Sequence, residues 1–243
     1  MSVRQRADRL LVERGLFASR AQAQAAITAG RVTADGNAVH KASEAISTTA
    51  AIKAEPAHPY VSRGGVKLAA ALDHFQLNVG GRVCLDVGAS TGGFTHVLVL
   101  RGARRVHAVD VGRDQLHASL RGRSEIDSVE ETDIRALHPS YFRGQPDFAT
   151  VDVSFISLKL VLSSVGKLLR QRATLLALIK PQFEGKRVDK KKGIVRDPAV
   201  HQAVCEDIAA FLAAQAWRVG GLMPSPIRGG DGNAEFFIEA ERG

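Results

Sequence analysis

The sequence predicts an α/β fold, a largely parallel sheet with crossover helices, preceded by a small α+β module. From residue 59 onward, short apolar runs alternate with segments of helical periodicity, which is the pattern of strand–helix–strand units. Within this part, residues 84–95 (CLDVGASTGGFT) join an apolar run to a helical pattern through a glycine-rich turn, as in doubly wound nucleotide-binding sheets. Two prolines in the stretch 54–59 (AEPAHP) disfavour regular structure. We therefore expect two domains, residues 1–58 and 59–243.

The first domain is predicted to contain two short helices followed by a β-hairpin. Apolar spacing predicts the first helix over residues 6–15. Ser19 is a suitable N-cap for a second helix, which should end at Gly30 because glycine accepts the left-handed conformation of a C-cap. The pair Asp35-Gly36 then predicts a hairpin turn between two short extended segments.

Basic side chains are numerous in this first domain and in the whole chain. The chain has 33 Lys and Arg against 25 Asp and Glu, a formal net charge of +8. Excess positive charge favours a polyanion as partner, because contacts with phosphates release counterions. The helix pair and basic hairpin resemble the ribosomal-protein-S4-like RNA-binding domain; a solvated helical appendage is the alternative. The expected RNA-contacting residues in and next to this domain are Arg4, Arg6, Arg20, Arg31, Lys41 and Arg63.

The second domain is predicted to contain seven strands and five helices. The strands are expected at residues 82–87, 105–110, 127–131, 147–152, 174–180, 217–223 and 234–240. The helices are expected at residues 64–76, 92–101, 113–120, 157–170 and 198–214. The last two strands, joined through residues 224–233, are expected to form a hairpin, so the final strand should be antiparallel.

The glycine-rich turn is a candidate cofactor site. Its spacing differs from the GxGxxG of dinucleotide sites, because Ala89 and Ser90 stand before Gly92. The acid Asp86 would repel a pyrophosphate but attract a cation. S-adenosylmethionine carries an ammonium and a sulfonium in its methionine half and is therefore the expected cofactor; a purely structural turn is the alternative. The turn residues assigned to the cofactor are Asp86, Gly88, Ser90, Thr91, Gly92, Gly93 and Phe94.

Acids that follow successive strands extend this site along the carboxyl edge of the sheet, where ligands bind in such folds. Asp110 ends the second predicted strand and is expected to accept hydrogen bonds from ribose hydroxyls. Asp133 follows the third strand and is expected at the adenine edge. Asp152 ends the fourth strand and completes the predicted cofactor set.

Two lysines and two acids are expected at this same edge. Asp152 and Lys180 end the fourth and fifth strands, while Lys67 precedes the first strand and Glu235 begins the last. A lysine at the end of a buried strand is costly without partners. We therefore expect the four side chains to compensate one another in one cleft, and four unrelated surface charges are the alternative.

In combination, the motifs SRGGVKL, CLDVGASTGGFT, VDVSFISL, KPQFE, GIVRDP and SPIRGGDGN resemble the TlyA/haemolysin A family. That family joins an S4-like domain to an FtsJ-type, Rossmann-like S-adenosylmethionine-dependent methyltransferase domain. The resemblance implies methyl transfer to a ribose 2′-hydroxyl of ribosomal RNA, at a cytidine, on free RNA or on a ribosomal subunit. It also implies a catalytic tetrad of Lys67, Asp152, Lys180 and Glu235. In that tetrad Lys180 is the candidate base, and Lys67 either disfavours its charged form or orients the hydroxyl.

A basic run follows the fifth predicted strand and is expected to rim the cleft and meet RNA phosphates. A solvated loop is the alternative, and this stretch resembles a shorter and more basic version of the family's loop. The basic residues of this run are Lys186, Arg187, Lys190, Lys191 and Lys192.

Other features argue against further classes of function. Cys84 and Cys205 stand in no metal-ligand spacing, so neither a disulfide scaffold nor a metal site is expected. There is no apolar run long enough for a bilayer and no signal-peptide pattern, so a cytoplasmic protein without a membrane partner is expected. The alternatives are a nicotinamide-dependent enzyme, a non-catalytic RNA-binding protein and a membrane-active haemolysin. The modified nucleotide and the oligomeric state stay open.

Overall fold

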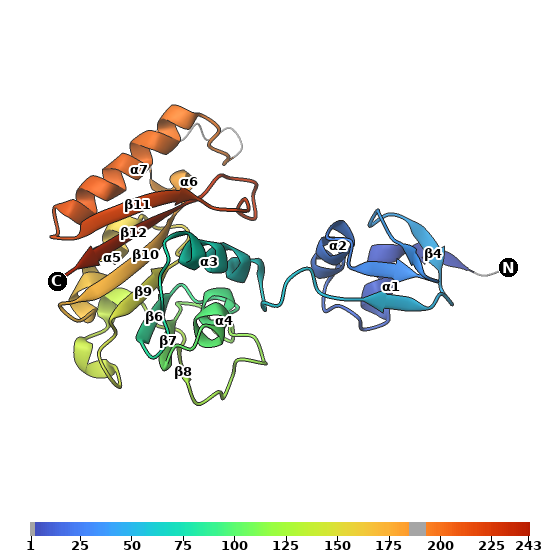
Figure 1. The fold of residues 1–243 in the computed structure, drawn as a ribbon, viewed down its shortest axis with the longest axis horizontal. Helices are drawn as coiled ribbons and strands as arrows, with labels where there is room; N and C mark the ends of the chain where they lie inside the picture. Colours follow the sequence, from blue (N-terminus) through green and yellow to red (C-terminus); the bar gives the residue numbers. More distant parts are fainter. Residues whose placement is uncertain (1–2, 185–192) are drawn as a thin grey trace. The chain divides into compact units, whose positions relative to one another are not determined.

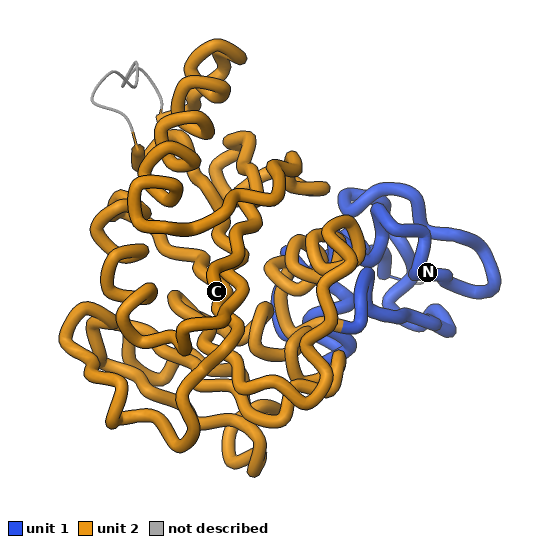
Figure 2. The backbone as a smooth tube through the Cα atoms, turned by 60° about the vertical axis from the view of Figure 1, so that its left-hand side comes forward, with its two compact units in different colours: residues 1–59 blue, residues 60–243 orange. Residues whose placement is uncertain are grey.

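The computed structural model describes residues 3–184 and 193–243. The chain forms two compact units, residues 1–59 and 60–243 (Figure 2). The hydrophobic cluster of the first unit shares no residue with those of the second, so each unit has its own core.

The first unit combines two helices with short strands (Figure 1). Helices α1 (Ala7–Glu13) and α2 (Arg20–Thr28) confirm the predicted helix pair. Gly30 ends α2 with a φ of +69°, and the N–H groups of Gly30 and Arg31 donate to carbonyls of the last helical turn. The strands are β1 (Arg4–Arg6), β2 (Val32–Ala34), β3 (Asn37–Ala38), β4 (Ala45–Ser47) and β5 (Ile52–Ala54).

The hairpin between β2 and β3 is also confirmed. Asp35 and Gly36 both have positive φ, +50° and +81°, as a two-residue hairpin turn requires. Strand β2 lies between β3 and β5, and β1 pairs with β4. Strands β1, β4 and β5 were not predicted, because three residues are too short for an alternation of apolar and polar side chains to stand out.

The second unit is built on a seven-stranded sheet in the order β11-β12-β10-β9-β6-β7-β8. Its strands confirm the seven predicted ones to within two residues at each end. They are β6 (Val83–Val87), β7 (Arg105–Val109), β8 (Ile126–Val129), β9 (Phe148–Val151), β10 (Ala173–Ile179), β11 (Arg218–Pro224) and β12 (Phe236–Arg242). Strand β12 is antiparallel to both β10 and β11, while β6 to β10 pair in parallel. The sheet therefore has the predicted topology, with the final hairpin at one edge.

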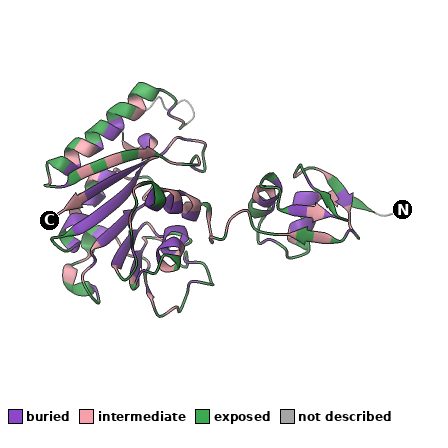
Figure 3. Cartoon of the chain, viewed as in Figure 1, coloured by how far each residue is buried: buried purple, intermediate pink, exposed green. Residues whose placement is uncertain are grey.

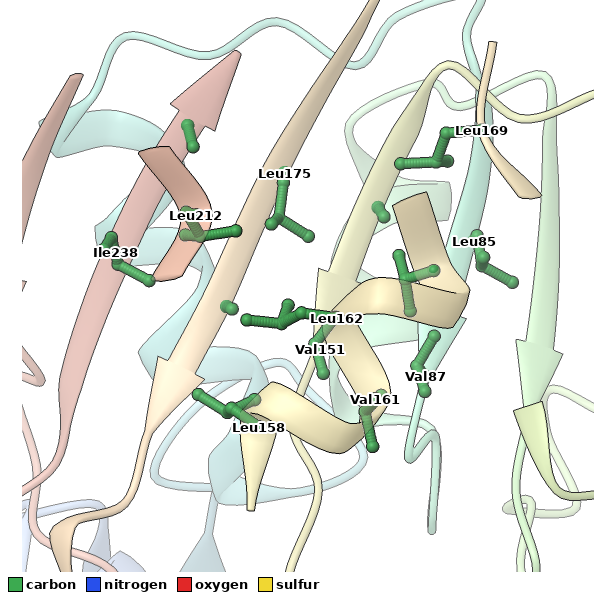
Figure 4. Close-up of a cluster of buried hydrophobic side chains, with 14 of the residues drawn as sticks. Leu85, Val87, Val151, Leu158, Val161, Leu162, Leu169, Leu175, Leu212 and Ile238 are labelled. Carbon is green, nitrogen blue, oxygen red and sulfur yellow. The ribbon is translucent and has the colours of Figure 1, made fainter. Parts of the chain in front are cut away.

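Helices cover both faces of this sheet. Alternate residues of one strand point to opposite faces, so Leu175 and Leu176 belong to different apolar clusters. Helices α5 (Leu158–Leu168) and α7 (Pro198–Ala213) pack on the face of Leu175 (Figure 4). The opposite face is covered by α3 (Arg63–His74) and α4 (Gly93–Leu100). The central strands are consequently buried along their length (Figure 3).

The helix predicted at residues 113–120 is wrong, because this segment is irregular. The backbone N–H groups of Asp114, Gln115 and Leu116 donate to the Glu130 carboxylate at 2.6–2.9 Å, and Asp114 has a φ of +52°. The Glu130 carboxylate thus accepts hydrogen bonds from the amides that would otherwise begin a helix. These bonds hold the segment against the end of β8. Three short elements were not predicted: η1 (Ile134–Ala136), η2 (Pro139–Tyr141) and α6 (Pro181–Glu184).

Candidate active site

The glycine-rich turn between β6 and α4 is tightly packed. Gly88 has a φ of +79°, and a Cβ at this position would lie 2.4 Å from the carbonyl oxygen of Asp152. Gly92 has a φ of +87°, and its Cβ would lie 2.5 Å from a methyl group of Leu120. Glycine is therefore required at both positions for two reasons. Residues with a side chain rarely adopt a positive φ, and a Cβ would clash with its neighbours here. The turn thereby brings the end of β6 against the end of β9.

A pocket of about 390 Å³ opens beside this turn, at the carboxyl edge of the sheet. This is within the usual size range of small-molecule sites, roughly 300–1,000 Å³. The predicted cofactor residues that line it are Gly88, Ser90, Asp110, Asp133 and Asp152. The remaining predicted turn residues, Asp86, Thr91, Gly92, Gly93 and Phe94, are outside its lining.

Asp86 lies inside β6 and not at its end. Its side chain is fully buried and accepts hydrogen bonds from the hydroxyls of Thr95, at 2.6 Å, and Thr150, at 2.8 Å. Burial raises the pKa of this carboxyl to about 6, although the two hydroxyls oppose the shift. The structure thus places Asp86 beneath the turn, where it ties β6 to α4 and β9.

The two acids after β7 and β8 both line the pocket but already have partners. Asp110 accepts hydrogen bonds from the backbone N–H groups of Ser90, at 2.8 Å, and Gly112, at 2.7 Å. Each of its carboxylate oxygens keeps a further lone pair for a ligand hydroxyl. Asp133 accepts two hydrogen bonds from the Arg135 guanidinium, which lowers the pKa of the Asp133 carboxyl. Both acids are therefore held in fixed positions in the lining of the pocket.

The donors and acceptors of the pocket fit S-adenosylmethionine. Apolar side chains such as Val111 and Ile134 suit an adenine ring, and Asp110 suits the hydroxyls of a ribose. Asp152 also lines the pocket, and its Oδ1 lies 2.6 Å from Lys180 Nζ, so the carboxylate stands between the pocket and a lysine. When bound, this cofactor supplies an electrophilic methyl group on a sulfonium that is a good leaving group.

The structure brings the two lysines and two acids of the sequence motifs together as two ion pairs. Lys67 Nζ lies 2.5 Å from Glu235 Oε2, and Lys180 Nζ lies 2.6 Å from Asp152 Oδ1. Both pairs lie at the same end of the β10–β12 pairing, because Ile179 lies opposite Phe236 there and Lys180 and Glu235 are the residues directly beyond them.

These ion pairs are largely removed from solvent. The side chains of Lys67 and Glu235 are 9% and 4% exposed, and that of Lys180 is 10% exposed. Charges buried to this degree are tolerated only when they are paired. Each of the four side chains thus has a partner of the opposite type within the site.

Several residues in the pocket lining, and one that supports it, were not identified from the sequence. Ser154 accepts a hydrogen bond from Lys180 Nζ at 2.8 Å, and Phe155 stands 91% exposed with a φ of +64°. Arg135 fixes Asp133, and Glu130 fixes the segment after Asp110. Ser154 and Phe155 belong to the VDVSFISL motif, which was the available signal for them, whereas Glu130 had none.

The predicted RNA-contacting arginines of the first unit are partly engaged within the protein. Arg6 and Arg20 both bind the buried carboxylate of Asp8, at 3.0 and 2.8 Å, and Arg6 lowers the pKa of Asp8 well below its usual range. Arg4 donates to the Ala45 carbonyl. Arg31 pairs with Glu55 at 3.3 Å.

The remaining predicted RNA contacts divide between exposed and undescribed positions. Lys41 and Arg63 are exposed. The basic residues Lys186, Arg187, Lys190, Lys191 and Lys192 lie outside the described residues. Within residues 3–184 and 193–243, no group of three or more His, Cys, Asp or Glu side chains could hold a metal ion. No helix in this same part of the chain is long and apolar enough to cross a membrane.

Two family models match the chain, one on each unit. Residues 60–242 match the FtsJ-like methyltransferase model, and residues 5–52 match the S4 domain model. Among curated relatives, the 16S/23S rRNA (cytidine-2′-O)-methyltransferase TlyA of Mycobacterium tuberculosis is 42% identical over 98% of this chain and 90% of its own. Hemolysin A of Brachyspira hyodysenteriae is 35% identical over 96% of this chain and 98% of its own.

Solved structures give the same fold. A chain from Streptococcus thermophilus named "Putative hemolysin" is 41% identical, with a TM-score of 0.77 over 100% of this chain and 90% of its own. The magnesium protoporphyrin IX methyltransferase of Synechocystis, solved with S-adenosylmethionine, has a TM-score of 0.51 and 17% identity over 73% of this chain and 78% of its own. At that identity the second likeness concerns the fold alone, which is that of S-adenosylmethionine-dependent methyltransferases.

Proposed function

Because this chain belongs to the FtsJ-like methyltransferase family and carries an S4 domain, we propose that it methylates a ribose 2′-hydroxyl of ribosomal RNA. The cofactor of this reaction is S-adenosylmethionine, and the expected target is a cytidine, as the name of the Mycobacterium tuberculosis relative states for that protein. The observation that carries the proposal is the pair of lysine–carboxylate contacts Lys67–Glu235 and Lys180–Asp152, the second of which includes the pocket residue Asp152.

The chemistry of a ribose hydroxyl calls for such groups. A protonated 2′-hydroxyl is a poor nucleophile, so a base must take its proton as the new oxygen–carbon bond forms. Lys180 is the base in our proposal, since it lies between Asp152 and the pocket residue Ser154. Asp152 then stabilises the ammonium that results. Holding the hydroxyl in line with the methyl group lowers the activation free energy further. This contribution can reach about 7–11 kcal/mol.

The pairing pattern assigns Lys67 a different task from Lys180. Glu235 lies 2.5 Å from Lys67 and compensates its charge, so repulsion between the two lysines is weak. Lys180, by contrast, contacts Asp152 and the pocket residue Ser154. We therefore propose that Lys67 and Glu235 orient the hydroxyl and fix the part of the site next to β12. Proton transfer is assigned to Lys180.

The S4 domain supplies the choice of RNA in this proposal. Its exposed basic residues, with those of the run 186–192, attract phosphates, and contacts with folded RNA fix which ribose reaches the pocket. Deletion of residues 1–58 is expected to reduce methylation of ribosomal substrates far more than affinity for the cofactor. Unchanged RNA methylation after this deletion would contradict the role of the domain.

The deciding experiment is transfer of a tritiated methyl group to separate ribosomal subunits, followed by mapping of the modified nucleotide. Lys180→Ala should abolish transfer while cofactor binding, measured by calorimetry, is retained. Lys167→Ala is the matched control, because Lys167 is an exposed lysine in the last turn of α5 and makes no contact with the pocket. A wild-type protein that binds RNA and cofactor but transfers no methyl group would favour a non-catalytic RNA-binding function instead.

A further inference from the structure

We propose that Ser154 is a further catalytic residue, which relays the proton of the ribose 2′-hydroxyl to Lys180. This inference rests on the proposed function and concerns the same site. Ser154 is exposed and lines the pocket, and its Oγ lies 2.8 Å from Lys180 Nζ. Lys180 is buried and is not part of the pocket lining. The hydroxyl of Ser154 therefore lies on the path from the pocket to the base.

The local backbone holds Ser154 in this place. Asp152 N donates to the Val87 carbonyl at 2.9 Å, which fixes the start of the segment 152–156 against β6. Phe155 has a φ of +64°, a conformation that residues other than glycine rarely adopt. The strained residue directly follows Ser154, so the chain turns sharply after the serine and leaves its side chain between the pocket and Lys180.

The hydrogen-bonding capacity of the two groups suits a relay. A serine hydroxyl donates one hydrogen bond and accepts two, so Ser154 can donate to Lys180 and accept from a substrate hydroxyl at the same time. As an ammonium, Lys180 donates to Ser154; as a free amine, Lys180 accepts from Ser154 over the same 2.8 Å. The amine still has N–H groups to donate to Asp152, which lies 2.6 Å away.

The proton balance of the step closes without any further reagent. The 2′-oxygen forms a bond to the methyl carbon as the carbon–sulfur bond breaks and its electron pair stays on sulfur. The proton of the 2′-hydroxyl moves to Ser154 Oγ, and the original Ser154 proton moves to the lone pair of Lys180 Nζ. Serine ends the step unchanged, and the positive charge lost by the sulfonium appears on Lys180, beside Asp152. Lys180 then releases its proton to solvent before the next turnover.

The alternative is that Ser154 only orients Lys180, which would take the proton directly. Both roles predict a slower reaction without the hydroxyl, so rate alone does not separate them. They differ in the number of protons that move in the chemical step: two for the relay and one for direct transfer. The dependence of the rate on the deuterium fraction of the solvent is curved for two moving protons and linear for one.

The test measures single-turnover methyl transfer to the ribosomal subunit that the wild type modifies, in mixtures of H₂O and D₂O. Ser154→Ala is expected to lower the rate about 100-fold or more, as for loss of a proton-transfer group. Its cofactor Kd should stay within twofold of the wild type. Ser154→Thr, which keeps a hydroxyl, should recover most of the rate. Ser128→Ala is the matched control, because Ser128 is an exposed serine of β8 outside the pocket lining.

The relay predicts a curved solvent dependence in the wild type and a linear one in Ser154→Ala. A Ser154→Ala rate within threefold of the wild type would overturn the relay, and so would a linear dependence in both proteins. If the wild type binds cofactor and RNA but methylates neither subunit, the proposed function fails and the relay fails with it. If the wild type methylates and only the predictions for Ser154 fail, the proposed function stands.

Discussion

The buried carboxylate of Asp86 should make the stability of the second unit fall as pH rises, and Asp86→Asn should remove this dependence. Asp86 is fully buried, and its pKa is raised to about 6 because burial disfavours the charged form. In the unfolded chain an aspartate has a pKa of about 3.9. The folded state therefore holds the proton more tightly than the unfolded state does. Stability is unaffected by this group below about pH 4, falls between about pH 4 and 6, and stays lower above that.

The size of the effect follows from the two pKa values. Between pH 4.5 and 7.5, the ionisation of Asp86 should cost the wild type roughly 2 kcal/mol of unfolding free energy. Asparagine has nearly the same shape and no charge. Thr95 and Thr150 can rotate their hydroxyls to donate to its oxygen and accept from its amide, so the hydrogen bonds survive. The stability of Asp86→Asn relative to the wild type should therefore rise by that amount over this pH interval.

The assay is urea unfolding of both proteins at each pH, followed by tryptophan fluorescence. The chain has one tryptophan, Trp217, which is buried in the core of the second unit and so reports on the unit that contains Asp86. Other titrating groups act equally on both proteins, so the difference between them isolates Asp86. A difference that is constant from pH 4.5 to 7.5 would refute the argument from burial.

Cofactor binding by the same variant tests the other role assigned to Asp86. Since Asp86 is outside the pocket lining and its oxygens bind two threonines, the cofactor Kd of Asp86→Asn should change by less than about fivefold, the equivalent of about 1 kcal/mol. A loss of affinity beyond a hundredfold would mean that its charge acts on the cofactor through the turn.

Two further substitutions test the site, each with a matched comparison. Gly88→Ala should cost more stability than Gly102→Ala, and it alone should weaken cofactor binding. Both glycines have φ near +80°, but a Cβ at residue 88 would lie 2.4 Å from a carbonyl oxygen, whereas one at residue 102 would lie no closer than 3.7 Å to any atom. Equal losses of unfolding free energy in urea would contradict this steric argument. Lys67→Met should destabilise the second unit by about 3–5 kcal/mol, because Glu235 is left buried and unpaired. Adding Glu235→Leu should restore most of that stability but no methyl transfer, and recovery of activity in the double variant would remove both residues from the mechanism.

The sheet could be predicted because its strands carry strong local signals. Strand β10, ATLLALI, is apolar apart from Thr174 and is bounded by charged residues, as expected of a strand buried on both faces. The prediction of a helix at residues 113–120 was wrong for the opposite reason, because contacts distant in sequence decide the structure of this segment. Its apolar residues Leu116 and Leu120 have helical spacing, but they pack over Gly92, and Glu130 takes the amides that would start a helix. Those contacts form only when the sheet has folded, so no local sequence pattern predicts them.

For the site, the sequence identified the four charged residues but not their pairing. Their order at strand ends was readable, because carboxyl ends of parallel strands meet at one edge. Pairing of Lys67 with Glu235 depends on how helix α3 packs beside the start of β12, which a single sequence does not specify. The same holds for Asp8, whose burial between Arg6 and Arg20 makes part of the basic surface structural.

These pairings have a consequence for how RNA is attracted. The two lysines of the site are each neutralised by an acid, and Arg6 and Arg20 share the charge of Asp8. In the proposed function, the excess of +8 therefore acts mainly from residues such as the exposed Lys41 and Arg63, rather than from Lys67 and Lys180. Salt screens exposed charges far more than buried pairs. Rising ionic strength should thus weaken the binding of RNA steeply while leaving the rate of the bound complex nearly unchanged.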